Sequence, residues 1–431
     1  MPSFASLRRI RLPACVLGVL LLARLFPLAP LSDPTGAALP TGLQLSAPPF
    51  YVLLAPLFSL WDAISMLSMS RLKGFLIGTV LLYAGWRIGA ALLRRARGAA
   101  AGGPGRGALM QELRVLAGSL AGFLAFLAAG GLWHRPMLAL TGAAPDEVIV
   151  DLHSHTNVSH DVRGTLMRGF DAEANRRWHA RSGFDAVFIT DHNTTAGWRA
   201  LRDDSRLPAV CPGIEVSAWQ AHIVLLGDTL EVDRSRYDRS LDGLLRLLAE
   251  SRPRYGALAV ASLPEYERSH WNRLDTLVQA GLAGFEIANA APKANELTRV
   301  RRDSVVALSR HYNLFLAGVS DSHGWGATSM VWSLVRVPGW RERMQEETPR
   351  SSRPLCEGIL RALGDGGFGA VRVVERQRLR PDSAWPAWLT PEGVIWETWR
   401  NMSWLVALGW FGWIACWAGL RLRGLPERPT P

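Results

Sequence analysis

Short apolar runs alternate with helical patterns across the middle of the chain. The runs Val148–Val150, Ala186–Ile189, Ile223–Leu226 and Phe315–Val319 have the length and composition of buried strands. Between them lie segments with helical spacing, at Asp171–Arg181, Leu241–Glu250, Arg273–Ala280 and Thr298–His311. Alternating strand and helix signals predict a parallel α/β fold. Roughly seven such units within residues 147–380 fit a single barrel better than an open sheet.

Longer apolar segments flank this region on both sides. They are Ala14–Pro30, Ala47–Met69, Gly74–Leu93, Val115–Trp133 and Met402–Leu420, and the last two contain no charged residue. A membrane span needs about 20 mostly apolar residues, so these segments predict transmembrane helices. Ala47–Met69 contains Asp62 and is the one we expect not to cross. The predicted domains are a membrane region (1–140) with three to four apolar segments, the barrel (147–380), a Trp/Pro-rich connector (381–400) and a C-terminal transmembrane helix (401–421).

Histidine and carboxylate residues cluster at the ends of the apolar runs. Residues 151–161 read DLHSHTNVSHD, and the i, i+2 spacing places His153 and His155 on one face of a strand end. Further clusters follow the next runs or lie beside them. Together the candidate metal ligands are His153, His155, Asp161, His192, Glu215, His222, Asp321 and His323. In parallel α/β folds the carboxyl ends of the strands gather catalytic groups, so these side chains are expected to meet.

The segments DLHSHTNVSHD, ITDHNT, GIEVS, HIVLLG and SDSH resemble, in order and approximate spacing, the motifs of the PHP (polymerase and histidinol phosphatase) superfamily. The resemblance covers roughly Val148 to Val374. It implies a distorted (βα)7 barrel that holds two or three divalent metals, and hydrolysis of phosphoesters, the reaction of most characterised members. The segment TDHNT at 190–194 also resembles the carbaryl-hydrolase-like branch, which cleaves amide or ester bonds and is often exported.

Carried over residue by residue, the resemblance implies three metal positions. His153, His155, Glu215 and Asp321 would hold one metal, and Glu215 would bridge to a second metal shared with His222. A third would be held by His192, His323 and either His160 or Asp161, of which we prefer Asp161.

The chain departs from the family at one step. The family carries an Ala-His-Pro step whose histidine completes the second metal, and here Leu263 occupies that place. Either the second site is weak, or His270 or Glu265 replaces the missing ligand.

The predicted ligands are imidazoles and carboxylates without cysteine, a set that suits Mn, Fe or Zn. Divalent ions that share a carboxylate generate a hydroxide nucleophile near neutral pH. The sequence therefore predicts a membrane-anchored, metal-dependent hydrolase, foremost a phosphoesterase, with Glu215, Asp321 and His323 as catalytic residues. The alternatives are an amide or ester hydrolase of the carbamate type, or a non-catalytic PHP-like binding module. The presence of Leu263 in place of a ligand histidine supports the binding module. Arg163, Arg268 and Lys293 are candidate phosphate contacts, although a loop arginine is more often plain surface.

The net charge is +11 and the pI is near 10.3, yet Lys73 and Lys293 are the only lysines. Much of the arginine lies beside the apolar segments, for example in Arg94–Gly107, so we infer no nucleic-acid binding from charge. The expected partners are a small-molecule ester substrate and the lipid bilayer, and the sequence does not indicate an oligomeric state.

The arginines also bear on orientation. Because arginine beside a span favours the cytoplasm, this distribution predicts a multi-pass inner-membrane protein with a periplasmic barrel. The rival topology places the barrel in the cytoplasm and exports the arginines of 94–114. Cys211 and Cys356 fall in the barrel, and four cysteines do not predict a disulfide framework.

Overall fold

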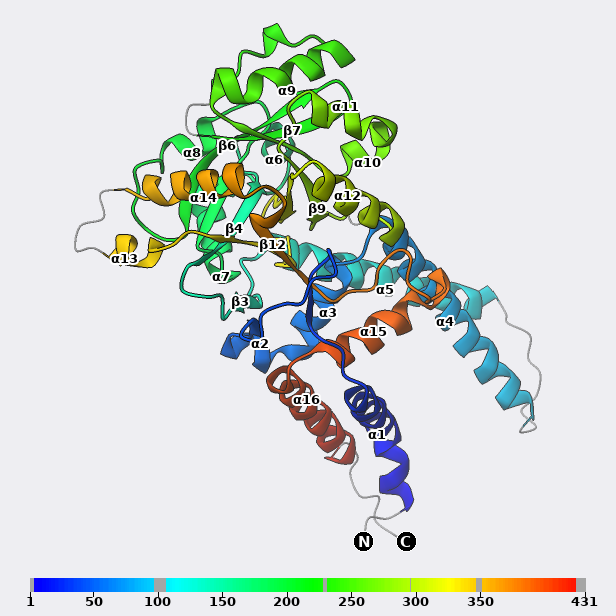
Figure 1. Cartoon of the computed structure of the whole chain (residues 1–431). Helices are drawn as coiled ribbons and strands as arrows, with labels where there is room; N and C mark the ends of the chain where they lie inside the picture. The colour runs from blue at the N-terminus through cyan, green and yellow to red at the C-terminus, as the bar shows by residue number, and fades with distance from the viewer. Residues whose placement is uncertain (1–3, 97–105, 228–230, 295, 346–350, 424–431) are drawn as a thin grey trace, which may run out of the picture.

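The computed structural model describes residues 4–96, 106–227, 231–294, 296–345 and 351–423 (Figure 1). A curled sheet with its covering helices forms one end of the molecule, and long apolar helices extend from the other end. The described part of the chain begins and ends at the tips of two of these helices, away from the sheet. The sequence-based division into an α/β body and an apolar helical part therefore corresponds to two regions in space.

The described strands form a ten-stranded sheet in the order β1-β12-β11-β4-β5-β6-β7-β8-β9-β10, and β2 pairs separately with β3. Their bounds are β1 Leu31–Ser32, β2 Gln44–Ser46, β3 Ala139–Thr141, β4 Glu147–Ser154, β5 Ala186–Ile189, β6 Ala209–Ala218, β7 Ala221–Leu226, β8 Leu258–Ala261, β9 Gly284–Asn289, β10 Phe315–Val319, β11 Val331–Arg336 and β12 Val371–Arg376. All four predicted apolar runs are strands or parts of strands. The short strand β1 comes from the N-terminal region and joins the sheet through β12.

The mixed α/β class is confirmed, but the sheet is a curled half-barrel and not uniformly parallel. β4, β5 and β6 run parallel, as do β8, β9 and β10, whereas β7 is antiparallel to both of its neighbours. The reason is local: only Trp219 and Gln220 separate β6 from β7, so the chain makes a tight hairpin there and not the crossover that a parallel pair requires. Gln220 has a φ of 49°, in the left-handed region that such tight turns use.

The curl brings β10, the last strand in the sheet order, back to β4. The amide of Asp321, after β10, donates to the carbonyl of His153 (2.9 Å), and the amide of His155 donates to the carbonyl of Ser322 (3.0 Å). The first and last ligand clusters of the sequence are therefore directly bonded through their backbones.

Helices cover the outside of the curled sheet (Figure 1). They are α6 His160–Arg163, α7 Ala172–Arg181, α8 Ala196–Arg199, α9 Leu241–Tyr255, α10 Glu265–Ser269, α11 Leu274–Gln279, α12 Arg299–His311, α13 Trp340–Gln345 and α14 Arg353–Gly366. The four predicted helices are confirmed as α7, α9, α11 and α12. Asp171 and Thr298 begin two of them as N-caps, since each side chain accepts a hydrogen bond from an amide of the first turn.

A disulfide joins Cys211 on β6 to Cys356 on α14, inside the hydrophobic core. The two cysteines lie 145 residues apart in the sequence, which is why spacing alone did not suggest the pair.

The helices outside the sheet domain are α1 Phe4–Leu25, α2 Pro49–Leu53, α3 Ala55–Ser65, α4 Met69–Ala96, α5 Arg106–Leu132, α15 Thr390–Asn401 and α16 Trp404–Arg423, and of these α15 is amphipathic and not apolar throughout. In the part of the chain that the structure describes, three segments are long and apolar enough to cross a membrane: Met69–Leu93, Met110–Leu132 and Trp404–Leu422. They contain most of three predicted spans. The predicted basic linker Arg94–Gly107 lies largely outside the described residues.

The segment Ala47–Met69 folds as α2 and α3, of 5 and 11 residues, both too short to span a bilayer. Asp62 of α3 is buried where these helices meet the sheet. Its carboxylate accepts hydrogen bonds from Arg135 (2.8 Å), Arg376 (2.9 Å) and Tyr51 (3.0 Å). We call these four residues the junction cluster. The predicted connector at 381–400 is largely helical, because α15 occupies most of it and packs against α3 and α4.

Candidate metal centre

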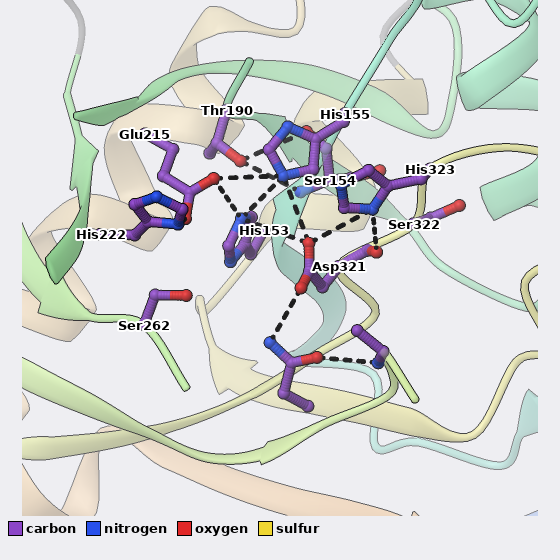
Figure 2. Close-up of polar contacts among 12 residues, drawn as sticks. His153, Ser154, His155, Thr190, Glu215, His222, Ser262, Asp321, Ser322 and His323 are labelled. Atoms are coloured by element: carbon purple, nitrogen blue, oxygen red, sulfur yellow. Dashed lines mark hydrogen bonds and ion pairs between the residues drawn. The ribbon is translucent and has the colours of Figure 1, made fainter. Parts of the chain in front are cut away.

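The predicted ligands converge at one edge of the curled sheet (Figure 2). His153 ends β4 and His155 follows it, while Asp161 lies on α6 and His192 follows β5. Glu215 and His222 face each other across the β6–β7 hairpin, and Asp321 and His323 follow β10. The eight side chains selected from the sequence therefore lie together, on six different elements or the turns beside them.

Three overlapping groups of ligand atoms have metal-site geometry. They are His153, His155 and Glu215; then His192, Glu215 and His222; then His155, Asp161, His192 and His323, with the ligand atoms of each group within 4.8 Å of one another. The shared members are His155, His192 and Glu215. Overlap of this kind is typical of clustered metal ions that share ligands.

The spacing of the ligand atoms matches a metal's requirements. His153 Nε2 and His155 Nε2 lie 3.0 Å apart, and they lie 3.2 and 3.3 Å from Glu215 Oε2. Ligands bound at about 2.1 Å in tetrahedral geometry are separated by about 3.4 Å. Asp321 Oδ1, 3.2 Å from His155 Nε2, completes the first predicted ligand set.

The structure also distinguishes between His160 and Asp161 as ligands of the third metal position. Asp161 Oδ2 lies 2.6 Å from His323 Nε2 and 3.2 Å from His192 Nε2, within the third group. The ring of His160 instead packs against that of His192 in a tilted arrangement, with centroids 4.7 Å apart. The arrangement thus favours Asp161, as the sequence did.

Two buried polar atoms of the centre form no hydrogen bond within the described residues. They are His192 Nδ1 and Asp321 Oδ1, and both atoms face other ligand atoms of the centre. A buried polar atom without a partner is costly unless a ligand satisfies it. The residues present therefore fit bound cations, and the nitrogen and oxygen donors suit Mn, Fe or Zn.

Backbone strain also marks the centre. Asp321 has a φ of 46°, in the left-handed region that side chains other than glycine seldom adopt. Such strain concentrates at functional sites because the surrounding structure must hold it in place.

The charged side chains of the centre shift the pKa values of one another. Burial lowers the pKa of His323, but the facing carboxylates Asp321 and Asp161 raise it to about 9. Burial, followed by the nearby charge of His323, lowers the pKa of His155 to about 4. Burial would raise the pKa of Glu215 and of Asp161, yet the surrounding imidazoles hold both well below their usual range. The carboxylates are therefore held ionised, as metal ligands must be.

Sequence reasoning missed the residues that orient these ligands. Glu286 is buried on β9, and its Oε1 lies 2.6 Å from His153 Nδ1. Its Oε2 accepts from the amide of Leu263 (2.8 Å) and from the side chain of Asn289 (2.9 Å). Metal-binding histidines commonly donate their other ring N–H to a carboxylate in this way. The signal available in the sequence was a glutamate in the middle of the apolar strand GFEIAN.

A second buried pair supports the strand that carries His153. Asp151 Oδ2 lies 2.8 Å from His179 Nε2, and Asp151 Oδ1 accepts from the amide of Ser320 (3.0 Å). Asp191, beside His192, accepts from the amide of Thr156 (2.6 Å), and burial raises its pKa to about 6. These carboxylates fix the turns that present the ligands.

The departure at Leu263 takes a different form from the one expected. The Leu263 side chain packs in the hydrophobic core and is 2% exposed, while its neighbours Ser262 and Pro264 line the metal cavity. Position 263 therefore does not face the cavity, because the turn after β8 directs Ser262 there instead.

The two suggested substitutes for the missing histidine also differ. His270 Nε2 lies 3.1 Å from the carbonyl oxygens of Trp219 and Gln220, so its contacts lie outside the centre. Glu265 lines the cavity, with Oε1 3.8 Å from His222 Nδ1. Of the two, Glu265 is placed to supply a ligand.

The candidate phosphate contacts are not equivalent. Lys293 lines the metal cavity and is the one Lys or Arg among its described lining residues. Arg268 does not line the cavity; it donates a hydrogen bond to the Lys293 carbonyl (2.6 Å) and so supports the loop that carries Lys293. Arg163 is exposed on α6 and does not line the cavity.

Comparisons with known proteins give only distant likenesses. No family model and no curated protein matches the chain. Among solved structures, a candidate metal-dependent phosphoesterase from Bifidobacterium adolescentis is 18% identical, covers 41% of this chain and 88% of its own, and has a TM-score of 0.32. PsfC from Pseudomonas syringae is 17% identical, covers 59% and 98%, and has a TM-score of 0.33. An amidohydrolase from Chromobacterium violaceum, solved with sulfate and no metal, is 17% identical, covers 40% and 87%, and has a TM-score of 0.27. At these scores the geometry of the site carries the functional argument.

Proposed function

We propose that this chain is a membrane-anchored, metal-dependent hydrolase that cleaves phosphate esters at a PHP-type site of two or three divalent ions, with Mn, Fe or Zn as the metal. The observation that carries the proposal is the overlap of three His/carboxylate groups through His155, His192 and Glu215. Bound cations in such a site lower the pKa of water and neutralise charge that develops on a phosphoryl oxygen.

The chain's own residues supply the remaining functions. Glu215 is shared by two of the three groups and sets the distance between their positions. Asp321 and His323 lie on the cavity wall and hold the substrate side of the centre. Lys293 is placed to contact the ester's phosphate, a role supported less well for Arg163 and Arg268.

An amide or ester hydrolase would use the same centre, so the leaving group must be tested directly. The full-length chain, purified in detergent and loaded with Mn, Fe or Zn, should be assayed against phosphomonoesters, phosphodiesters and aryl carbamates. We expect turnover of a phosphoester, and its loss in Glu215→Gln. Turnover of carbamates alone would overturn the phosphoesterase proposal in favour of amide or ester hydrolysis. Stoichiometric metal without any turnover would favour a binding module.

We further propose that the sheet domain lies outside the cytoplasm. Positive charge beside a span favours the cytoplasmic side, and the arginines at the start of α1, the end of α4 and the end of α16 lie on helix ends directed away from the sheet (Figure 1). The Cys211–Cys356 pair supports the same side, because disulfides persist in oxidising compartments.

A reporter fused after Pro431 tests this orientation. We expect a cytoplasmic reporter to be active there and a periplasmic one to be silent, and the reverse result would contradict it. In this arrangement residues 1–140 and 401–421 form the membrane part, 147–380 the hydrolase and 381–400 the connector.

A further inference from the structure

The cavity that contains the metal centre is bounded on one side by the membrane part of the chain. It encloses about 710 Å³. One wall carries the ligand side chains, and the other includes Ser65, Met69 and Gly131 from the apolar helices. The reaction site and the helices that approach the bilayer therefore share one space.

The membrane-side residues of this wall lie at the ends of candidate spans. Met69 is the first residue of the apolar stretch Met69–Leu93, and Gly131 is the penultimate residue of Met110–Leu132. Both ends point toward the sheet domain, so the cavity lies at the level where these helices would leave the bilayer.

The loop that carries His323 packs directly on the end of α5. The ring of Trp325 lies against that of His134, with centroids 4.1 Å apart. A Cβ at Gly326 would lie 3.0 Å from the Cα of Gly131, so the two backbones approach closely. Trp325 and Gly326 follow His323 by two and three positions, so this contact directly adjoins the ligand.

The segment that carries Asp161 presents apolar side chains at the surface. Leu166 is 80% exposed, Val158 is exposed as well, and Met167 lines the cavity. Much of the remaining lining is small and uncharged, at Ala290, Ala291, Pro292, Gly324, Gly326 and Ala327. Exposed apolar groups beside a functional cavity point to an apolar ligand or a membrane surface.

The charge of the lining is also informative. Lys293 is the only Lys or Arg among the described lining residues, whereas recognition of free polyphosphates usually employs several cationic side chains. A single phosphate group attached to an apolar body fits this lining better than a soluble polyanion.

We propose that the substrate is a phosphoester of a membrane lipid, whose phosphate reaches the metal centre while its hydrocarbon chains remain at the ends of α4 and α5. This inference rests on the proposed phosphoesterase function. In the reaction, water adds its oxygen to phosphorus, the phosphorus–oxygen ester bond breaks, and the leaving oxygen takes up the proton that the water releases.

Matched long- and short-chain substrates test the proposal. The full-length, metal-loaded chain in mixed micelles should be assayed with dioleoyl and dibutyryl phosphatidate as monoesters, and with dioleoyl and dibutyryl phosphatidylglycerol as diesters. We expect kcat/KM to be at least about tenfold higher for the long-chain member of one pair, since burial of two further methylene groups is already worth that factor.

The outcomes separate the two proposals. Turnover with a long-to-short ratio near one in both pairs would overturn the lipid inference and leave the phosphoesterase intact. No turnover of these four esters or of soluble phosphoesters would overturn the phosphoesterase and the lipid inference with it. Turnover of soluble phosphoesters but of none of the four would overturn the lipid inference alone.

A matched pair of variants locates the lipid contact. Met69→Asn places a polar group on the cavity wall, and Leu405→Asn makes a comparable change at the sheet-proximal end of α16, outside the cavity lining. We expect Met69→Asn to lower the long-to-short ratio and Leu405→Asn to leave it unchanged, with both variants eluting as monodisperse protein. An equal effect of the two variants, or none, would contradict the placement at α4.

Discussion

Two clusters of buried charge differ in how their charges are balanced. In the junction cluster, the single carboxylate of Asp62 is met by two guanidinium groups, Arg135 and Arg376, at 2.8 and 2.9 Å. At the metal centre, Glu215, Asp321 and Asp161 face imidazoles. Asp321 and Asp161 also accept hydrogen bonds from the neutral side chains of Asn289 (3.2 Å) and Ser159 (2.6 Å). The Asp62 carboxylate is fully paired, and the junction cluster carries one more positive than negative charge. The carboxylates of the centre, in contrast, have no Lys or Arg partner among the ion pairs of the described residues. The first arrangement holds two regions together, and the second is built to receive an ion.

The strongest test of this contrast is removal of the shared carboxylate. We expect at least two divalent metals per chain in the wild type after reconstitution. Glu215→Gln should bind fewer and lose activity by more than about 100-fold, which exceeds the loss typical of an outer, orienting residue. Elemental analysis and turnover measure both effects.

Glu286→Gln is the matched comparison, because it keeps all the predicted ligands and changes the buried carboxylate that contacts His153, Leu263 and Asn289. A loss of about 10–100-fold in metal affinity is expected there. Equal metal content in the wild type and in Glu215→Gln would contradict the proposal that Glu215 is shared by two metal ions.

The junction should respond in stability and not in metal content. Asp62→Asn leaves Arg135 and Arg376 buried without a counter-charge, and such a loss costs about 3–5 kcal/mol. We therefore expect a clearly lower unfolding temperature in detergent, with the metal content of the folded fraction unchanged.

Arg336→Gln provides the control, because its pair with Asp146 is largely exposed and worth about 1 kcal/mol at most. If Asp62→Asn unfolds no earlier than this control, the junction cluster does not anchor the two regions.

The same contrast explains how much the sequence could predict. The ligands were found because each follows or adjoins a recognisable apolar run, as with His153 and Asp321, so local pattern and position agree. The pairing of Asp62 with Arg135 and Arg376 spans 73 and 314 residues, and no local pattern connects them. The antiparallel course of β7 was missed because a two-residue turn leaves almost no trace in hydrophobic periodicity.

The smallest expected effect concerns the turn after β8. Because Ser262 lines the cavity and Leu263 packs in the core, Ser262→His is the change that would add an imidazole near Glu215 and His222. We expect it to tighten binding of one metal by up to about tenfold, the lower end of what a change around a metal is worth. Leu263→His should instead bury an imidazole in an apolar core, at a cost of about 1–3 kcal/mol, with no gain in metal. Metal titration and thermal unfolding of the two variants separate these effects. Tighter binding in Leu263→His alone would show that position 263 reaches the centre.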